Sequence, residues 1–276
     1  MLIARGLNSG NMQSVEDLRR IGRELRGGEL GLRTHPVGIK FCPESCDLTG
    51  FRRPRNFGIH MTVCQVINAA RYGWAMAFTL EDMFCIGGAY LFGLVPEYPE
   101  FLETPISRHT SSDDAKKHIN SRYLENALPK GSVKAVLVAP LESINFIPDV
   151  IDVYGTPTQI NTIAKSLIWH GIFPETELLG LISCSVVTRA YKTRKPQVKI
   201  PGSGEIAWGG RTEEDEVSIT IPLEHIDKVL SGLENIKRLN PYPPPRFWWY
   251  EPIAPKGYTI TYKDYEEWKK RKNPQA

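Results

Sequence analysis

The sequence lacks a membrane-spanning run, a strong net charge and a large number of cysteines. No window approaches the roughly 18 consecutive apolar residues of a transmembrane helix. The amino-terminal stretch MLIARGLNSGNMQSVEDLRR has no basic region followed by an apolar one, so it does not resemble a signal peptide. The formal charge of +3 comes from 34 basic and 31 acidic residues spread along the chain, which disfavours nucleic acid as a partner. We expect a cytoplasmic protein that binds neither membranes nor nucleic acid.

The 5 cysteines are odd in number and irregularly spaced, which is unlike the disulfide framework of a small secreted domain. We therefore expect reduced thiols, whose roles are burial, metal binding or catalysis. Cys42 and Cys46 are close enough in sequence to form a pair of metal ligands, with Pro43 between them.

Hydrophobic patterning predicts a mixed α/β fold, organised as a single domain over residues 1–240. The stretch SVKAVLVAPL (132–141) contains an unbroken apolar run, which is typical of a strand buried on both faces. Further strands are expected at 36–41, 74–80, 149–155, 177–191 and 216–223, with Cys184 on the fourth of these. Helices are expected at 14–28, 62–73, 112–128 and 222–239, after Thr156, and in a short segment that starts near Thr79 and carries Cys85 in its last turn.

The last stretch, residues 241–276, has a different composition. It has six prolines before Gly257 and clusters of tryptophan and tyrosine, so no helix is expected before YKDYEEWKKRK (262–272). We interpret it as an irregular C-terminal extension that packs on its own domain. A homo-oligomer contact is the second interpretation, because tryptophan, tyrosine, phenylalanine and arginine are enriched in interface cores.

Two segments of the chain resemble each other. TVCQVINAARYGWAMAFTLEDMFCIGG (62–88) and TPTQINTIAKSLIWHGIFPETELLGLISCS (156–185) align Gln65 with Gln159 and Cys85 with Cys184. The match predicts an internal duplication of strand-helix-strand halves, 36–128 and 132–235, related by a pseudo-twofold axis. The amino ends of the two helices would then meet at a common centre, where the helix dipole would lower the pKa of the Cys64 thiol.

Three cysteines lie in these segments and could bind a metal: Cys64, Cys85 and Cys184. Thiolates are the soft ligands that zinc and iron-sulfur clusters prefer, and we expect the three sulfurs within about 7 Å of one another. Their spacing matches no zinc or ferredoxin signature. Two other interpretations stay open: the cysteines are small buried hydrophobic residues, or one of them is a catalytic nucleophile.

The glycine-rich stretch KIPGSGEIAWGGR (199–211) could turn backbone amides onto an anion, or it is a plain turn. Glu205 and Arg211 within it, together with Arg71, are candidates for holding a carboxylate or phosphate group. Arg71 could equally cap the end of its own helix.

Two histidines occupy loosely equivalent places in the two similar segments. His60 precedes the first helix and His170 follows the second. Each is a candidate proton shuttle or ligand, although a histidine near a helix end is more often a cap or packing residue.

Four stretches together resemble the bacterial and archaeal domain-of-unknown-function family 169. They are, in chain order, CQVINAARYGWAMAFTLEDMFCIGGAYLFGL, VLVAPLESINFIPDVIDVYGTPTQI, GLISCS and KIPGSGE, and the similarity spans roughly residues 36–235. The family pattern has cysteine at the positions of Cys64, Cys85 and Cys184. It also tends to have cysteine where this chain has Gly202, so the resemblance implies that one further ligand is missing here. The family carries no settled activity.

These observations favour an iron-sulfur enzyme of anaerobic metabolism. The three cysteines would bind a 4Fe-4S cluster and leave one iron open to a small, anionic substrate, with His60 or His170 moving protons and Arg71 or Arg211 orienting the substrate. The alternatives are a non-catalytic protein that binds a small anion or serves in assembly, with cysteines that only pack, and a zinc-dependent hydrolase.

Overall fold

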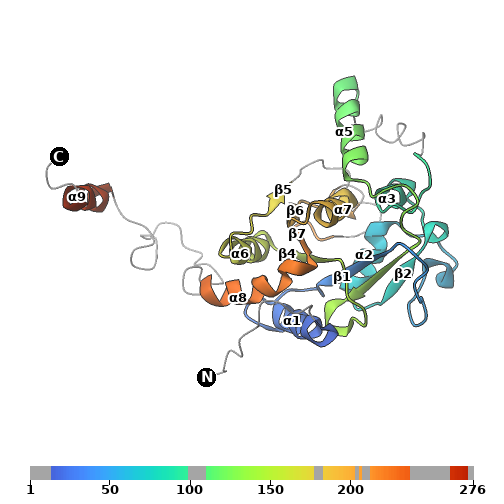
Figure 1. Cartoon of the computed structure of the whole chain (residues 1–276), viewed down its shortest axis with the longest axis horizontal. Helices are drawn as coiled ribbons and strands as arrows, with labels where there is room; N and C mark the ends of the chain where they lie inside the picture. The colour runs from blue at the N-terminus through green and yellow to red at the C-terminus, as the bar shows by residue number, and fades with distance from the viewer. Residues whose placement is uncertain are drawn as a thin grey trace.

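The computed structural model describes residues 14–98, 110–176, 183–202, 205–206, 212–236 and 262–272. Within these residues the chain builds a mixed α/β fold around one seven-stranded sheet, with helices on both sides of it (Figure 1). The strand order is β2-β3-β1-β4-β7-β6-β5, and neighbouring strands are antiparallel except for the parallel pair β5 and β6. The strands are β1 (Val37–Cys42), β2 (Met76–Phe78), β3 (Ala135–Pro140), β4 (Val150–Gly155), β5 (Glu175–Thr176), β6 (Gln197–Lys199) and β7 (Val217–Pro222).

Two helical layers cover the two faces of the sheet. One layer shares an apolar core with Ile39 and Val138 and consists of α2 (Val63–Arg71), α3 (Ile86–Leu91), α5 (Asp113–Asn126) and α7 (Ser183–Thr193). The other packs on Ile151 and Ile219 and consists of α1 (Val15–Gly27), α6 (Pro157–Ile168) and α8 (Ile226–Ile236). Short 3-10 turns η1 (Pro54–Phe57), η2 (Leu80–Asp82), η4 (Leu141–Ser143) and η6 (Leu223–His225) connect these elements. All six residues of β3 are buried, which confirms the expected two-faced burial.

Local sequence signals account for the starts of several helices. Ser14 and Asp17 form a capping box at α1, as their spacing predicts. The two glutamines aligned in the sequence both complete a capping box. The backbone N–H of Thr62 donates to the side chain of Gln65 at α2, and that of Thr156 donates to the side chain of Gln159 at α6, both over 2.8 Å. Part of the similarity between the two segments is therefore a shared capping box. The duplication, its pseudo-twofold axis and the domain limits stay predictions.

The expected strand at 177–191 is wrong for its described part. Residues 183–193 form helix α7, and residues 177–182 lie outside the described part of the chain. The run of β-branched residues favours a strand, but Val187 and Ala190 are fully buried and Tyr191 packs against the same core. This spacing of three and four residues places the apolar side chains on one helical face, so tertiary packing overrides the local preference.

The expected position of Cys85 within its helix is also wrong. The helix that starts after Thr79 is the short turn η2, and Cys85 instead precedes α3 as its N-cap residue. Gly87 and Gly88 lie inside α3 and are buried there. Close packing is the reason at Gly88, because an added Cβ atom would lie 3.0 Å from Cγ2 of Val63 on α2.

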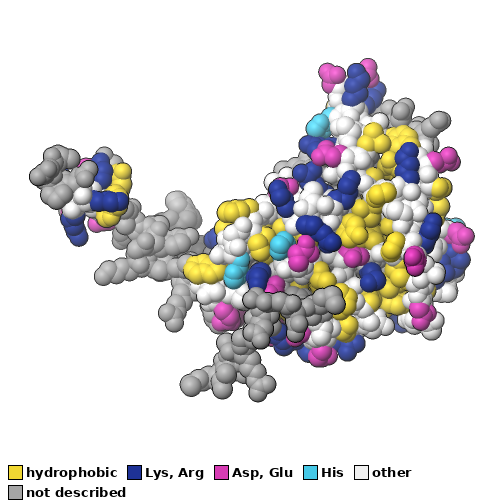
Figure 2. Space-filling model, in the orientation of Figure 1, with side chains coloured by type: hydrophobic (Ala, Val, Ile, Leu, Met, Phe, Trp, Pro, Cys, Tyr) yellow, Lys and Arg dark blue, Asp and Glu magenta, His cyan; other side chains and the backbone are white. Residues whose placement is uncertain are grey.

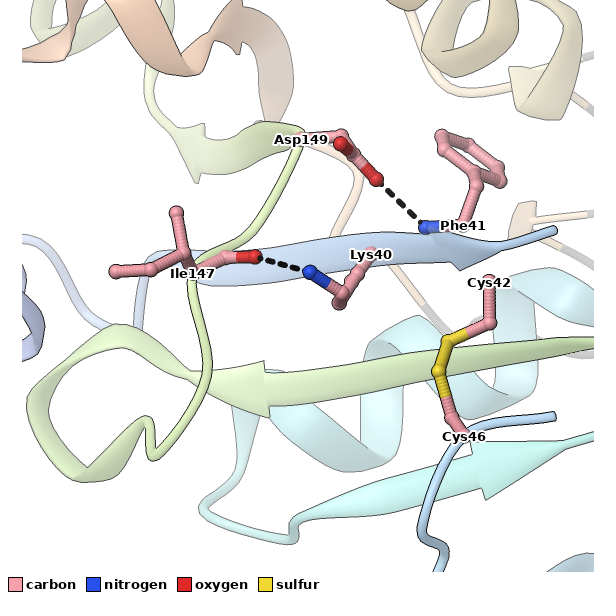
Figure 3. The surroundings of a disulfide bond; sticks show 6 residues. All are labelled: Lys40, Phe41, Cys42, Cys46, Ile147 and Asp149. Atoms are coloured by element: carbon pink, nitrogen blue, oxygen red, sulfur yellow. Dashed lines mark hydrogen bonds between the residues drawn. A yellow bond between two sulfur atoms is a disulfide. The ribbon is translucent and has the colours of Figure 1, made fainter. Parts of the chain in front are cut away.

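The expectation of reduced thiols is wrong for two cysteines. Cys42 and Cys46 form a disulfide, with their Cα atoms 6.1 Å apart, beside the end of β1 (Figure 3). Cys64, Cys85 and Cys184 are free thiols. Of the C-terminal extension, the structure describes α9 (Tyr262–Lys272), which confirms the helix expected there.

Basic and acidic side chains are interspersed over the face shown in Figure 2, between apolar patches. In the part of the chain that the structure describes, no helix combines the length and the apolar character needed to cross a membrane.

Candidate functional site

The three free cysteines come from three separate helix starts. Cys64 is the second residue of α2, Cys85 caps α3 and Cys184 is the second residue of α7. All three are half-buried, and α7 packs against both α2 and α3. Segments that are far apart in sequence therefore carry their thiols to one region between the sheet and the helices.

Gly88 allows this close approach. Its backbone N–H donates to the sulfur of Cys85 over 3.4 Å. A Cβ atom added at Gly88 would lie 3.7 Å from the sulfur of Cys184 and 3.0 Å from Cγ2 of Val63, the residue before Cys64. A side chain at this position would fill the space in which the three segments meet.

A buried polar face of the sheet lies on the same side as these helices. The antiparallel register places residues of β4, β7 and β6 in two rows that point to one face of the sheet. The rows are Asp152, Thr220 and Gln197, and Tyr154, Ser218 and Lys199. All six are at most 3% exposed. Since buried strand faces are normally apolar, two adjacent polar rows are a candidate functional feature.

Lys199 is the centre of this face. Its ammonium group donates to Asp152 over 3.2 Å, to the hydroxyl of Tyr154 over 3.1 Å and to Oε1 of Glu205 over 3.2 Å. The hydroxyl of Tyr154 donates in turn to Glu205 over 2.6 Å. An ammonium group has three donors, so Lys199 uses all of them within the protein.

Arg71 is the second buried cation. Its guanidinium donates to both carboxylate oxygens of Glu216 over 2.6 Å, contacts Thr34 and Asn68, and lies 3.9 Å from the ring centre of Tyr154. The sequence placed Arg71 at the end of α2 as an anion holder or a helix cap. In the structure it is 1% exposed and pairs with a carboxylate of its own chain.

Every buried charge of this network has an opposite partner. Asp152 and Glu205 share the ammonium group of Lys199, and Glu216 pairs with Arg71 and lies 3.8 Å from the guanidinium of Arg33. Buried charges are costly unless they are paired, so this pairing holds the polar face together.

Burial governs the protonation of the thiols. Burial, and next the carboxylate of Glu205, raise the pKa of Cys64 to about 11. The pKa of Cys184 is also raised well above its usual value, first by burial and then by Cys85, Cys64 and Glu205. The expected lowering at the helix start is therefore wrong for Cys64, because desolvation and a nearby carboxylate outweigh the helix dipole.

The buried lysine and tyrosine have perturbed pKa values too. Burial lowers the pKa of Lys199, but Asp152 and Glu205 outweigh this effect, so the pKa is raised and the group stays protonated. Burial and the same two carboxylates raise the pKa of Tyr154, which keeps its hydroxyl neutral and able to donate.

The histidines named from the sequence do not join this network. His60 is exposed, two residues before the cap of α2. His170 is exposed at the end of α6, in the opposite helical layer, where its Nε2 lies 3.0 Å from the hydroxyl of Ser231 on α8. The structure thus separates His170 from the cysteines by the sheet. Arg211 lies outside the described residues.

Sequence reasoning missed Asp152, Tyr154 and Lys199 as site residues. The signal was present: Asp152 interrupts an apolar strand, VIDVYG, and a charged residue inside such a strand needs a buried partner. Two more polar atoms of the same face, Oε1 of Gln197 and Oγ of Ser218, are buried without a hydrogen-bond partner among the described residues.

Three thiols are soft donors, of the kind that zinc and iron-sulfur clusters prefer. In the described ranges, no three histidine, cysteine, aspartate or glutamate side chains are placed to hold one metal ion.

The fold and the site define an α/β protein with three free thiols beside a buried, charged sheet face. The chain belongs to the family DUF169, described as "Uncharacterised ArCR, COG2043", whose model matches residues 28–232. This confirms the resemblance seen in the sequence. The chain is similar to "Uncharacterized protein MJ0308" of Methanocaldococcus jannaschii, with 27% identity over 188 residues, which cover 64% of this chain and 77% of the relative. No solved structure matches.

Proposed function

We propose that this chain is a cytoplasmic iron-sulfur enzyme of anaerobic metabolism. Cys64, Cys85 and Cys184 would bind three irons of a 4Fe-4S cluster, and the fourth iron would stay open to a small substrate. The observation that carries the proposal is the gathering of three thiols, from three helix starts, beside a buried, charged sheet face. When bound, the cluster would supply a Lewis acid at its open iron.

The arrangement supports a cluster better than a single zinc ion. A single ion needs its ligands around one point, with zinc–sulfur bonds of about 2.3 Å, and no described trio of ligand side chains is placed in this way. The cysteines of a cluster each bind a different iron, so they can lie further apart. The proposal keeps the expectation that the three sulfurs lie within about 7 Å of one another.

The pairing of the two buried cations also bears on the small-anion alternative. The donors of Lys199 are all used within the protein, and Arg71 pairs with Glu216. Neither cation offers a free charge to an anion. We therefore place the non-catalytic anion-binding function second and leave the substrate class to experiment.

Residues of the chain would have defined roles around the cluster. Thiols with raised pKa values release their protons when they bind metal, which adds negative charge to the site. Lys199 stays protonated and would balance part of that charge. The hydroxyl of Tyr154 holds its proton toward Oε1 of Glu205, so it orients this carboxylate.

The test is iron and sulfide analysis of the full chain purified without oxygen, before and after reconstitution. The proposal predicts a brown protein with about four irons per chain, and a loss of iron in each of the variants Cys64→Ser, Cys85→Ser and Cys184→Ser. The double variant Cys42→Ser/Cys46→Ser is the matched control and should keep its iron. This control leaves unchanged the three free thiols, Cys64, Cys85 and Cys184, which lie outside the disulfide.

A lack of iron would overturn the proposal. A colourless protein with less than about half an iron per chain after reconstitution would exclude the cluster. If zinc is bound instead, and any of the three serine variants loses it, the zinc hydrolase gains support. If no metal is bound and each substitution only lowers the free energy of unfolding by about 1–2 kcal/mol, the cysteines serve packing.

A further inference from the structure

We propose that the disulfide between Cys42 and Cys46 is redox-active and that a cellular dithiol reduces it reversibly. Reduction of this disulfide would loosen the chain that leads from Asp82 to Cys85. The proposal concerns the regulation of the thiol site but does not require a cluster, since it is tested on free thiols.

The first observation is that sheet pairing holds Cys42 in addition to the disulfide. Strand β1, which ends at Cys42, is paired with β3 along its whole length and with β4 over Val37–Ile39. The backbone N–H of Lys134 also donates to the carbonyl of Cys42 over 2.7 Å. The disulfide closes a loop with a sequence separation of 4, and short loops remove little chain entropy from the unfolded state. A small contribution to stability is typical of a bond that can open without unfolding the protein.

The second observation is that Cys42 and Cys46 differ in their exposure to solvent. Cys42 is fully buried beside Ala77, Ala135 and Leu137, whereas Cys46 is half-exposed. The three residues between them, 43–45, are all exposed. An external thiolate can therefore reach Cys46 from solvent, while the buried Cys42 is the natural leaving group.

The chemical step is thiol–disulfide exchange. A thiolate of the external dithiol attacks the sulfur of Cys46, the bond between Cys42 and Cys46 breaks, and Cys42 leaves as a thiolate that takes up a proton. The second thiol of the reductant then attacks the mixed disulfide, releasing Cys46, which is protonated in turn. The protein pair gains two electrons and two protons, and the dithiol becomes an internal disulfide.

The third observation is a continuous path from this loop to Cys85. The loop after Cys46 packs through Leu48 and Phe51 on the same small apolar cluster as Cys42. Arg52 follows and is bound to β2, because its carbonyl accepts from the N–H of Ala77 over 2.9 Å.

Two arginines continue the path. Arg53 and Arg55 donate to the fully buried carboxylate of Asp82 over 2.5 and 2.6 Å. Asp82 ends the turn η2, three residues before Cys85. The carbonyl of Asp82 accepts from the N–H of Met61, and the carbonyl of Met61 accepts from that of Phe84, the neighbour of Cys85.

This path gives the disulfide a mechanical connection to the site. With the pair closed, the loop holds Arg53 and Arg55 against Asp82 and so fixes the entry into α3. With the pair open, residues 43–48 lose their covalent tie to β1, and the arginines are held less firmly. Cys184 lies on α7, which packs against α3 but, among the described residues, makes none of the hydrogen bonds of this path, so it should respond less than Cys85.

The experiment uses the full chain in buffers that contain reduced and oxidised dithiothreitol in graded ratios. After acid quenching and alkylation, peptide mass spectrometry gives the fraction of the pair that is open and the alkylation rate of each free cysteine. We expect reversible opening under native conditions and a severalfold faster alkylation of Cys85 in the open form, with a smaller change at Cys184. The variant Cys42→Ser/Cys46→Ser should reproduce the fast rate without reductant.

Two outcomes would overturn the proposal. In the first outcome, the disulfide between Cys42 and Cys46 resists excess dithiothreitol until the protein unfolds. In the second, the disulfide opens but the alkylation rate of Cys85 stays the same. If the double variant fails to fold, the titration of the wild-type chain still decides the question. An absence of iron in the metal analysis would refute the proposed function but would not change the result of the disulfide titration. A failure of the proposed function is therefore distinguishable from a failure of this proposal.

Discussion

The protonation of Cys64 offers a direct test of the buried site. Burial and the carboxylate of Glu205 raise the pKa of this thiol from an ordinary value of 9.0 to about 11. At pH 8, about 0.1% of such a thiol is ionised, against about 10% of an ordinary one, a hundredfold difference. A thiolate of higher pKa is intrinsically more reactive, by about six- to tenfold over two pKa units. Cys64 should therefore react roughly ten times more slowly than an ordinary cysteine, before any effect of restricted access.

The assay is the rate of iodoacetamide alkylation at Cys64, followed by peptide mass spectrometry from pH 7 to the highest pH at which the protein stays folded. The rate should keep rising about tenfold per pH unit and should not level off near pH 9. Glu205→Gln removes one of the two causes, so the same rate should increase at every pH below the plateau. A profile that levels off at or below pH 9 in the wild-type chain would refute the reasoning, because it would show that the helix start outweighs burial.

Two stability predictions follow from packing and charge. Gly232→Ala would place a Cβ atom 2.7 Å from the carbonyl carbon of Ser166 where α8 crosses α6, so urea unfolding should show a loss of about 2–3 kcal/mol. Gly27→Ala, at the end of α1, meets nothing within 4 Å and should change stability by less than about 1 kcal/mol; equal losses would contradict the packing argument. Burial raises the pKa of Asp82, but its two arginine partners outweigh burial and the pKa is lowered. Its contribution is present above the unfolded-state pKa of about 3.9 and is lost as the pH falls through the lower folded value. The wild-type advantage over Asp82→Asn should therefore shrink in acid, and parallel pH profiles would contradict this.

The sequence by itself determined the features that depend on residues within one helical turn or one strand. The capping boxes at Ser14, Thr62 and Thr156 each join residues three positions apart, so the residue types alone predict them. The two-faced burial of β3 follows from its apolar run. The family was also recognisable, because its blocks are contiguous in the chain.

Tertiary structure decided how distant residues meet. Lys199 pairs with Asp152 across 47 positions, and Arg71 pairs with Glu216 across 145, because the register of β4, β7 and β6 and the packing of α2 bring them together. Composition and spacing carry no record of that register. Cys184 shows the same limit: its β-branched neighbours suit a strand, yet the core selects a helix, since only a helical face buries Val187 and Ala190 together. Tertiary structure also decided the pKa of Cys64, because it is raised by burial in the fold and by the carboxylate of Glu205, which is distant in sequence.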